Sequence, residues 1–204
     1  VWTLYAVLAK GSQDIHFDMG ELVAWAREPA LGYPKHPPFS AWLVKAWFSV
    51  FPLADWAYYL LAMANAAVAL WIAWVVAGRF LQPEKRAAGL ALLTLVPFFN
   101  FHALKFNANS VMIPLWALTT WAFIVSFETR WPLPAALAGL AAAAAMLGKY
   151  WSIILLVSLG IAVLTHPARR QYFRSPAPYV TIAAGALALA PHLLWMIEKS
   201  TTVA

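Results

Sequence analysis

Cysteine is absent from this chain, and charged residues are scarce. The lack of cysteine excludes disulfides, thiolate metal sites and cysteine nucleophiles, which leaves His, Asp and Glu as the available metal ligands. Only 11% of the residues are charged, against about 25% in an ordinary soluble domain, and 63% of the 204 residues are hydrophobic. A soluble globule needs a more charged surface, whereas lipid needs none. The composition therefore predicts an integral membrane protein.

Apolar stretches without charge recur along the chain at lengths suited to a bilayer, which a helix of about 20 residues crosses. They lie at residues 56–78, 87–104, 106–127, 131–148, 150–165 and 177–197. The two shorter stretches, 131–148 and 150–165, predict a tight hairpin at Lys149, because one continuous helix over both would be about 50 Å long. Residues 1–9 are also apolar, and we interpret them as a truncated first span. We expect an all-α bundle of about seven transmembrane helices, in a single module over residues 1–204 that is a fragment lacking its C-terminal part.

The basic residues lie between the apolar stretches and predict the orientation in the membrane. The 14 Lys and Arg residues divide evenly between the two sides of the membrane, but on one side they lie in much shorter loops. These loops hold Arg79, Lys85, Arg86, Arg130, Arg169, Arg170 and Arg174. By the positive-inside rule this side is cytoplasmic. The long segment at residues 10–55 then lies on the outer face.

Two short helices are expected within the outer segment. Asp18 is followed three residues later by Glu21, a capping-box spacing that predicts a helix over residues 19–28 with Asp18 as its N-cap. Pro29 ends this helix. The next helix carries an apolar stripe of Phe39, Trp42, Leu43, Ala46, Trp47, Val50 and Phe51. It either lies flat in the membrane interface or, because Ala41, Val44 and Phe48 occupy the other face, packs against the spans.

Polar residues gather at the outer ends of the spans. No span carries Asp, Glu, Lys or Arg in its middle, which disfavours a coupled transporter, and interhelical hydrogen bonding explains Asn65. The outer polar residues are Asp14, His16, Asp18, Glu21, Lys35, His36, His102, Lys105, Asn107, Asn109, Lys149, Tyr150 and His192. This distribution fits a site at the membrane boundary, where a substrate keeps a lipid tail in the bilayer and a polar head outside.

Structural roles compete with function for many of these residues. Lys35 and His36 suit snorkelling at the interface. Asn107 and Asn109 suit a turn that opens the following helix. A metal site is a further alternative, although its spacing matches no recognised pattern. It would use His16, Asp18, Glu21 and His36.

Five features in order along the chain resemble a known enzyme family. An outer-face Asp18 precedes the string Gly32-Tyr33-Pro34-Lys35-His36-Pro37-Pro38, which is followed by the Trp-rich helix. Asn107-Ala108-Asn109-Ser110 and Gly148-Lys149-Tyr150 come later. This order resembles the polytopic GT-C glycosyltransferases, and within them the family 39 protein-mannosyltransferase-like group, which includes the aminoarabinose and galacturonic acid transferases of lipid A. Family members often have an acid at the position of Lys35, so the chain departs from the pattern there.

The resemblance implies sugar transfer from a polyprenyl-phosphate donor to an acceptor hydroxyl, with segment 10–55 as the catalytic loop. Asp18 maps onto the catalytic Asp and would accept the hydroxyl proton in a single inverting displacement. Donor-phosphate ligands would be Lys35, His36, Lys149 and Lys105. Sugar or acceptor ligands would be Glu21, Tyr33, Asn107, Asn109 and Tyr150. No cofactor is certain, and a divalent metal stays open.

The resemblance also implies a location and partners. We expect a bacterial cytoplasmic (inner) membrane protein whose active site faces the periplasm. Its partners would be membrane lipids, the lipid-linked donor and an envelope glycan, lipid or protein as acceptor, with no nucleic acid. A non-catalytic membrane subunit or lipid-binding module with the same scaffold is the alternative, and a flippase-like transporter is a weaker one.

Overall fold

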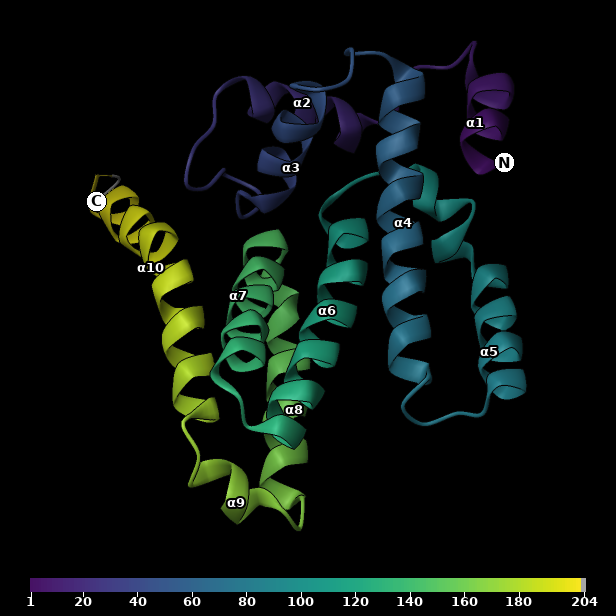
Figure 1. The fold of residues 1–204 in the computed structure, drawn as a ribbon. Helices are drawn as coiled ribbons and strands as arrows, with labels where there is room; N and C mark the ends of the chain where they lie inside the picture. Colours follow the sequence, from purple (N-terminus) through teal and green to yellow (C-terminus); the bar gives the residue numbers. More distant parts are fainter. Residues whose placement is uncertain (203–204) are drawn as a thin grey trace. The chain divides into compact units, whose positions relative to one another are not determined.

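The computed structural model describes residues 1–202, with side chains through Lys199, and shows ten α-helices and no strand in this part of the chain. The helices are α1 (Trp2–Lys10), α2 (Phe17–Arg27), α3 (Phe39–Phe48), α4 (Asp55–Ala77), α5 (Pro83–Leu95), α6 (Ala108–Thr129), α7 (Pro132–Gly148), α8 (Ile153–Thr165), α9 (Arg169–Phe173) and α10 (Ala177–Thr202). Figure 1 shows their order along the chain. The expected all-α class is confirmed.

The chain divides into two compact units. Unit 1 contains Val1–Ala30 and Pro38–Pro114, and unit 2 contains Leu31–Pro37 and the chain from Leu115 onward. The short Leu31–Pro37 segment therefore belongs to unit 2, although the residues on both sides of it belong to unit 1.

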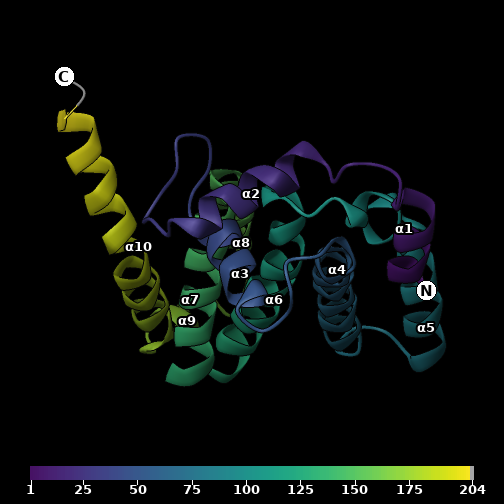
Figure 2. The same ribbon diagram turned by 90° about the horizontal axis from the view of Figure 1, so that it is seen from above.

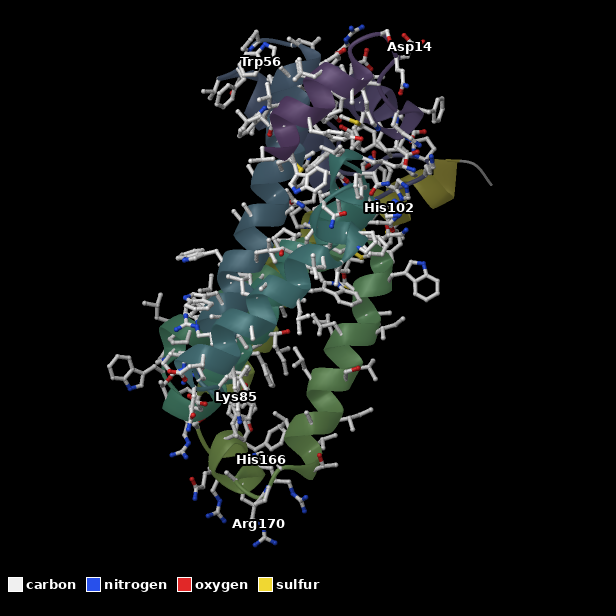
Figure 3. The ribbon with its side chains drawn as sticks, turned by 90° about the vertical axis from the view of Figure 1, so that its right-hand side faces the viewer. Asp14, Trp56, Lys85, His102, His166 and Arg170 are labelled. Atoms are coloured by element: carbon white, nitrogen blue, oxygen red, sulfur yellow. The ribbon has the colours of Figure 1, made fainter. Side chains whose placement is uncertain are left out.

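Unit 1 is organised around α4. Helices α1 and α5 both pack against α4, and α2 packs on α3 (Figures 1 and 2). The indole N–H of Trp47 in α3 donates to the carbonyl of Ala57 in α4, at 2.9 Å. Figure 3 shows Asp14 and Trp56 at one end of this unit and Lys85 at the other. The residues expected outside and the residues expected in the cytoplasm are therefore at opposite ends of unit 1.

Small residues let two helices of unit 2 approach closely. Helix α7 lies alongside α10 (Figures 1 and 2), with Gly139 against Gly185. A Cβ atom at Gly139 would collide with the carbonyl oxygen of Thr181. The Thr181 hydroxyl also donates to the carbonyl of Ala135, at 3.0 Å. The Ala-rich and Gly-rich sequence of α7 thus serves helix packing, as small residues do in membrane bundles.

The expected hairpin at Lys149 is confirmed. Helix α7 ends at Gly148, and the short 3₁₀ turn Tyr150–Ser152 leads into α8. The Ser152 hydroxyl donates to the carbonyl of Ala145 at 2.8 Å and accepts the indole N–H of Trp116 at 2.9 Å. These bonds fix the turn to α6 and α7.

Three helices within the described residues are long and apolar enough to cross a membrane: Asp55–Ala77, Ala108–Thr129 and Ala177–Lys199. Pro132–Gly148 and Tyr150–Thr165 are shorter apolar helices. Large apolar side chains on α10 are exposed, with Ile182 at 69% and Leu187 at 75%. Such exposure is favourable only in an apolar solvent, so the chain is an integral membrane protein. A total of about seven crossings stays a prediction.

The expected helix over residues 87–104 is wrong at both of its ends. Helix α5 begins four residues earlier at Pro83, because proline suits the first turn of a helix, where its missing N–H is not needed. The helix ends at Leu95, since Pro97 restricts Val96 to an extended conformation. Two 3₁₀ turns, Pro97–Phe99 and His102–Leu104, follow. The shift leaves the turn before α6, which the sequence predicts on the outer face, longer than expected.

The apolar stripe of α3 stays partly open, while the opposite face is buried. Ala41 and Val44 are buried, and the Phe48 ring contacts Tyr58 of α4 edge-on. Val50, in the stripe just after the helix, is 78% exposed. Of the two expected alternatives, the structure shows packing, through Ala41, Val44 and Phe48, while the stripe is only partly buried.

Candidate functional site

The expected site residues divide between the two units. Asp18, Glu21, Lys105, Asn107 and Asn109 belong to unit 1. Tyr33, Lys35, His36, Lys149 and Tyr150 belong to unit 2. The two sets are described in turn.

Asp18 lies in the first turn of α2 and contacts two other candidate residues. Its Oδ2 atom is 3.1 Å from Nζ of Lys105 and accepts a hydrogen bond of 2.9 Å from Nδ2 of Asn107. The two partners are nearly 90 residues away in sequence, just before α6. The Asp18 side chain is 26% exposed and that of Lys105 is 38% exposed. A carboxylate, an ammonium group and an amide thus meet at a partly open surface.

The N-cap of α2 is His16, which corrects the expectation for Asp18. The Nδ1 atom of His16 accepts the backbone N–H of Asp18 at 3.1 Å. This bond satisfies one of the free N–H groups at the start of the helix. Asp18 therefore lies inside the first turn of α2, and its carboxylate faces Lys105 and Asn107.

The pKa of Asp18 is lowered from its ordinary value. Burial by itself raises this pKa, because it disfavours the charged form. The hydrogen bond from Asn107, the ion pair with Lys105 and the nearby charge of His16 together outweigh burial. Asp18 is therefore ionised at neutral pH and able to accept a proton.

Asn107 caps the start of α6, one of the roles that the sequence left open, and also contacts Asp18. Its Oδ1 atom accepts the backbone N–H groups of Asn109 at 3.0 Å and Ser110 at 3.1 Å, which caps the start of α6. Its own backbone N–H donates to the Ser110 hydroxyl at 2.8 Å. Because these bonds hold the side-chain oxygen, the amide nitrogen points to Asp18. The cap thereby orients the amide N–H of Asn107 that donates to Asp18.

Helix α4 holds both segments that meet here: α2, which carries Asp18, and the start of α6, which follows Asn107. The buried Tyr58 hydroxyl donates to the carbonyl of Met19, the residue after Asp18, at 3.1 Å. Nδ2 of Asn65 donates to the carbonyl of Ser110 at 2.8 Å, which confirms the expected interhelical bond. The two bonds tie α2 and the start of α6 to one rigid span.

A cavity of about 150 Å³ lies beside Lys105 and Asn107. Its lining includes Asn109 and, from the turn before α6, His102. The ring of His102 is 5.6 Å from that of Phe98, centre to centre. His102 was not among the expected site residues, although its place among the outer-end polar residues is a signal that could have found it.

In unit 2, the Leu31–Pro37 loop is tied to α10. The backbone N–H of Tyr33 donates to the carbonyl of His36 at 3.1 Å, which closes a turn around Lys35. Gly32 packs so closely on the ring of Trp195 that a Cβ atom would collide with it. Lys35 is exposed, while Tyr33 and His36 are partly buried.

Tyr150 begins the turn after Lys149 and also contacts α10. Its hydroxyl lies 2.7 Å from Nε2 of His192 and 3.3 Å from the sulfur of Met196. Lys149 is extended at the end of α7 and partly buried. Glu21, in unit 1, is partly buried in the second turn of α2.

Metal ligation was one alternative for the outer histidines and acids. Among the side chains described, no group of three or more His, Asp or Glu residues is arranged to hold a metal ion. Of the residues in that alternative, His16 caps α2, and Asp18 faces a lysine and an amide.

Comparison with known proteins identifies a family and a relative. The profile of the dolichyl-phosphate-mannose-protein mannosyltransferases matches residues 35–195. A lipid A galacturonosyltransferase of Rhizobium johnstonii is 25% identical over 191 residues, which cover 93% of this chain and 40% of that protein. The chain thus spans about 40% of the length of this relative. No solved structure matches significantly. Because the profile covers most of the sequence, this chain belongs to the dolichyl-phosphate-mannose-protein mannosyltransferase family, within the GT-C group of membrane glycosyltransferases.

Proposed function

We propose that the protein is a membrane glycosyltransferase that moves a sugar from a polyprenyl phosphate to an acceptor hydroxyl on the periplasmic face. One observation carries the proposal within this family: the Asp18 carboxylate contacts Lys105 and Asn107, which favour its ionised form, at a partly open surface. A carboxylate in this state is suited to act as a general base.

The reaction needs only one base. Asp18 accepts the proton of the acceptor hydroxyl while the hydroxyl oxygen attacks the anomeric carbon. The bond from that carbon to the phosphate oxygen breaks on the opposite face, and its electrons leave with the polyprenyl phosphate. The sugar is inverted in this single displacement. Phosphate is already a good leaving group, so no strong general acid is required.

The remaining residues bind the two substrates. Cations stabilise the charge that develops on the leaving phosphate, and we assign this role to Lys35, His36, Lys149 and Lys105. Sugar or acceptor contacts are assigned to Glu21, Tyr33, Asn107, Asn109 and Tyr150. The wide apolar faces of the spans suit the lipid tail of the donor, and an inner-membrane location follows from this substrate.

Asp18→Asn tests the proposal. The amide has nearly the same shape but cannot take a proton, so we expect sugar transfer in native membranes to fall by about 10²-fold to 10⁴-fold. Asp14→Asn, an exposed neighbour four residues earlier, is the matched control and keeps full activity. Folding is compared by thermal unfolding of each purified protein. Full transfer by a folded Asp18→Asn protein would refute the assigned base, whereas no transfer by the purified wild-type protein would favour a non-catalytic subunit with the same scaffold.

A further inference from the structure

His192 in α10 is a buried polar residue that the proposed reaction does not use. Its side chain is only 2% exposed. Nδ1 lies 2.5 Å from the carbonyl oxygen of Leu31, and Nε2 lies 2.7 Å from the hydroxyl of Tyr150. The ring is also stacked on Trp195 at 5.9 Å between centres. Both ring nitrogens are therefore bonded to other segments of unit 2.

The partners determine the roles of the two nitrogens. A backbone carbonyl can only accept, so Nδ1 carries the hydrogen and donates to Leu31. In a neutral ring Nε2 then accepts the hydroxyl hydrogen of Tyr150. His192 thus links one acceptor and one donor at a fixed separation, which a side chain with a single polar atom cannot do.

The segments that His192 joins carry three of the four residues assigned to the donor phosphate, among them the cations Lys35 and Lys149. The bond to Leu31 holds the loop that contains Lys35 and His36. The bond to Tyr150 holds the turn that begins directly after Lys149. Trp195, one turn of α10 further on, presses on Gly32 and gives the loop a second attachment.

We propose that His192 is a positioning residue that holds the Lys35 loop and the Lys149 turn in register to bind one lipid-linked phosphate. The inference rests on the proposed function, because it takes the donor phosphate as the shared ligand of these cations. His192 itself does not touch the phosphate. It sets the spacing between cations that come from segments more than 100 residues apart.

Substitutions at His192 separate the two bonds. An Asn amide lies near the position of Nδ1, so His192→Asn keeps the bond to Leu31 and loses the bond to Tyr150. A Gln amide reaches the position of Nε2, so His192→Gln keeps the bond to Tyr150 and frees the loop. His192→Phe keeps the ring and loses both bonds.

The measurement is binding of undecaprenyl phosphate to the purified full-length protein in nanodiscs, with undecaprenol as the probe without phosphate. We expect His192→Phe to weaken undecaprenyl phosphate binding about tenfold, the effect of one to two lost buried hydrogen bonds. His192→Asn and His192→Gln are expected to lie between wild type and His192→Phe. Undecaprenol binding stays unchanged in all of them. His166→Asn, an exposed histidine after α8, is the matched control and binds like wild type.

A double-mutant cycle distinguishes positioning from general destabilisation. If His192 acts through the loop cation, His192→Phe has a much smaller effect in a Lys35→Gln background than in wild type. Equal losses in both backgrounds, or losses for undecaprenol as well, would show that His192 only stabilises the fold and would overturn the inference. Wild-type binding in every folded variant would overturn it too. If wild type itself prefers undecaprenol or binds neither lipid, the proposed donor fails, and the inference fails with it.

Discussion

Lys105 contacts the proposed base, so removing its charge changes the acidity of Asp18. Lys105→Met keeps an unbranched apolar side chain but cannot donate or form the ion pair. Asp18 retains the hydrogen bond from Asn107. Because the ion pair with Lys105 is one of the causes that lower the pKa of Asp18, we expect this pKa to rise in Lys105→Met.

The geometry limits the size of the effect. The ion pair is close, at 3.1 Å between Nζ and Oδ2, but the two side chains are 38% and 26% exposed. Solvent screens such a pair, and exposed ion pairs contribute about 0.2–1 kcal/mol. The free energy of unfolding at neutral pH should fall by this amount. The hydrogen bond from Asn107 is unaffected, so Asp18 stays anchored to the start of α6.

The assay is the pH dependence of sugar transfer in native membranes, with thermal unfolding as a second readout. A general base must be deprotonated, so the rate falls at acid pH, and a raised pKa moves this fall to higher pH. Folding lowers the pKa of Asp18, so the stability from its contacts is complete above the unfolded value of about 4 and is lost as pH falls through the folded value. The stability difference between wild type and Lys105→Met should therefore disappear at acid pH.

Lys45→Met is the control, since Lys45 is an exposed lysine of α3 in the same unit. Lys45→Met removes an equal charge, and the transfer rate of this variant should fall at the same acid pH as that of wild type. The reasoning is refuted if Lys105→Met leaves the profile unmoved, moves it to lower pH, or shifts it no more than Lys45→Met does.

Two further predictions concern the scaffold. Gly139→Val places side-chain atoms against the carbonyl of Thr181 and should destabilise unit 2 by about 1–3 kcal/mol in thermal unfolding. Gly160→Val, where the space is open, should change little, and equal effects would contradict the packing of α7 on α10. Asn65→Ala removes the bond to Ser110 and should lower stability by about 0.6–2 kcal/mol. An unchanged unfolding temperature would show that this bond does not hold α6.

The membrane character and most helices could be predicted from the sequence, because hydropathy and helical period are local properties. The expected helix over residues 19–28 forms as Phe17–Arg27, and the hairpin at Lys149 forms as expected. Helix α5 was misplaced because an uncharged apolar run continues past Pro97, where the backbone cannot continue the helix. The length of an apolar stretch therefore predicts that a segment lies in the membrane, but it does not predict where the helix ends.

The candidate site was only partly predictable. The acid at Asp18 was found, but its role as a cap was wrong, because His16 also accepts a backbone N–H and lies at the true start of α2. The contacts with Lys105 and Asn107 depend on how α2 and α6 are both held by α4, which no local pattern encodes. His192 stood in the sequence only as one of several polar residues at the outer ends of the spans, and its burial became visible in the structure. Its partners lie far away in the sequence and only the fold shows them.

The bond between Leu31 and His192 spans 161 residues, which has a consequence for biosynthesis. The Leu31–Pro37 segment leaves the ribosome early, whereas α10 is the last helix described. At about 5–20 residues per second, the loop waits roughly 8–30 s for its partner. During this time the loop lacks its contacts with His192 and Trp195 of α10. A ribosome stalled before α10 would therefore hold this loop open to protease, and the loop would become protected once α10 is inserted.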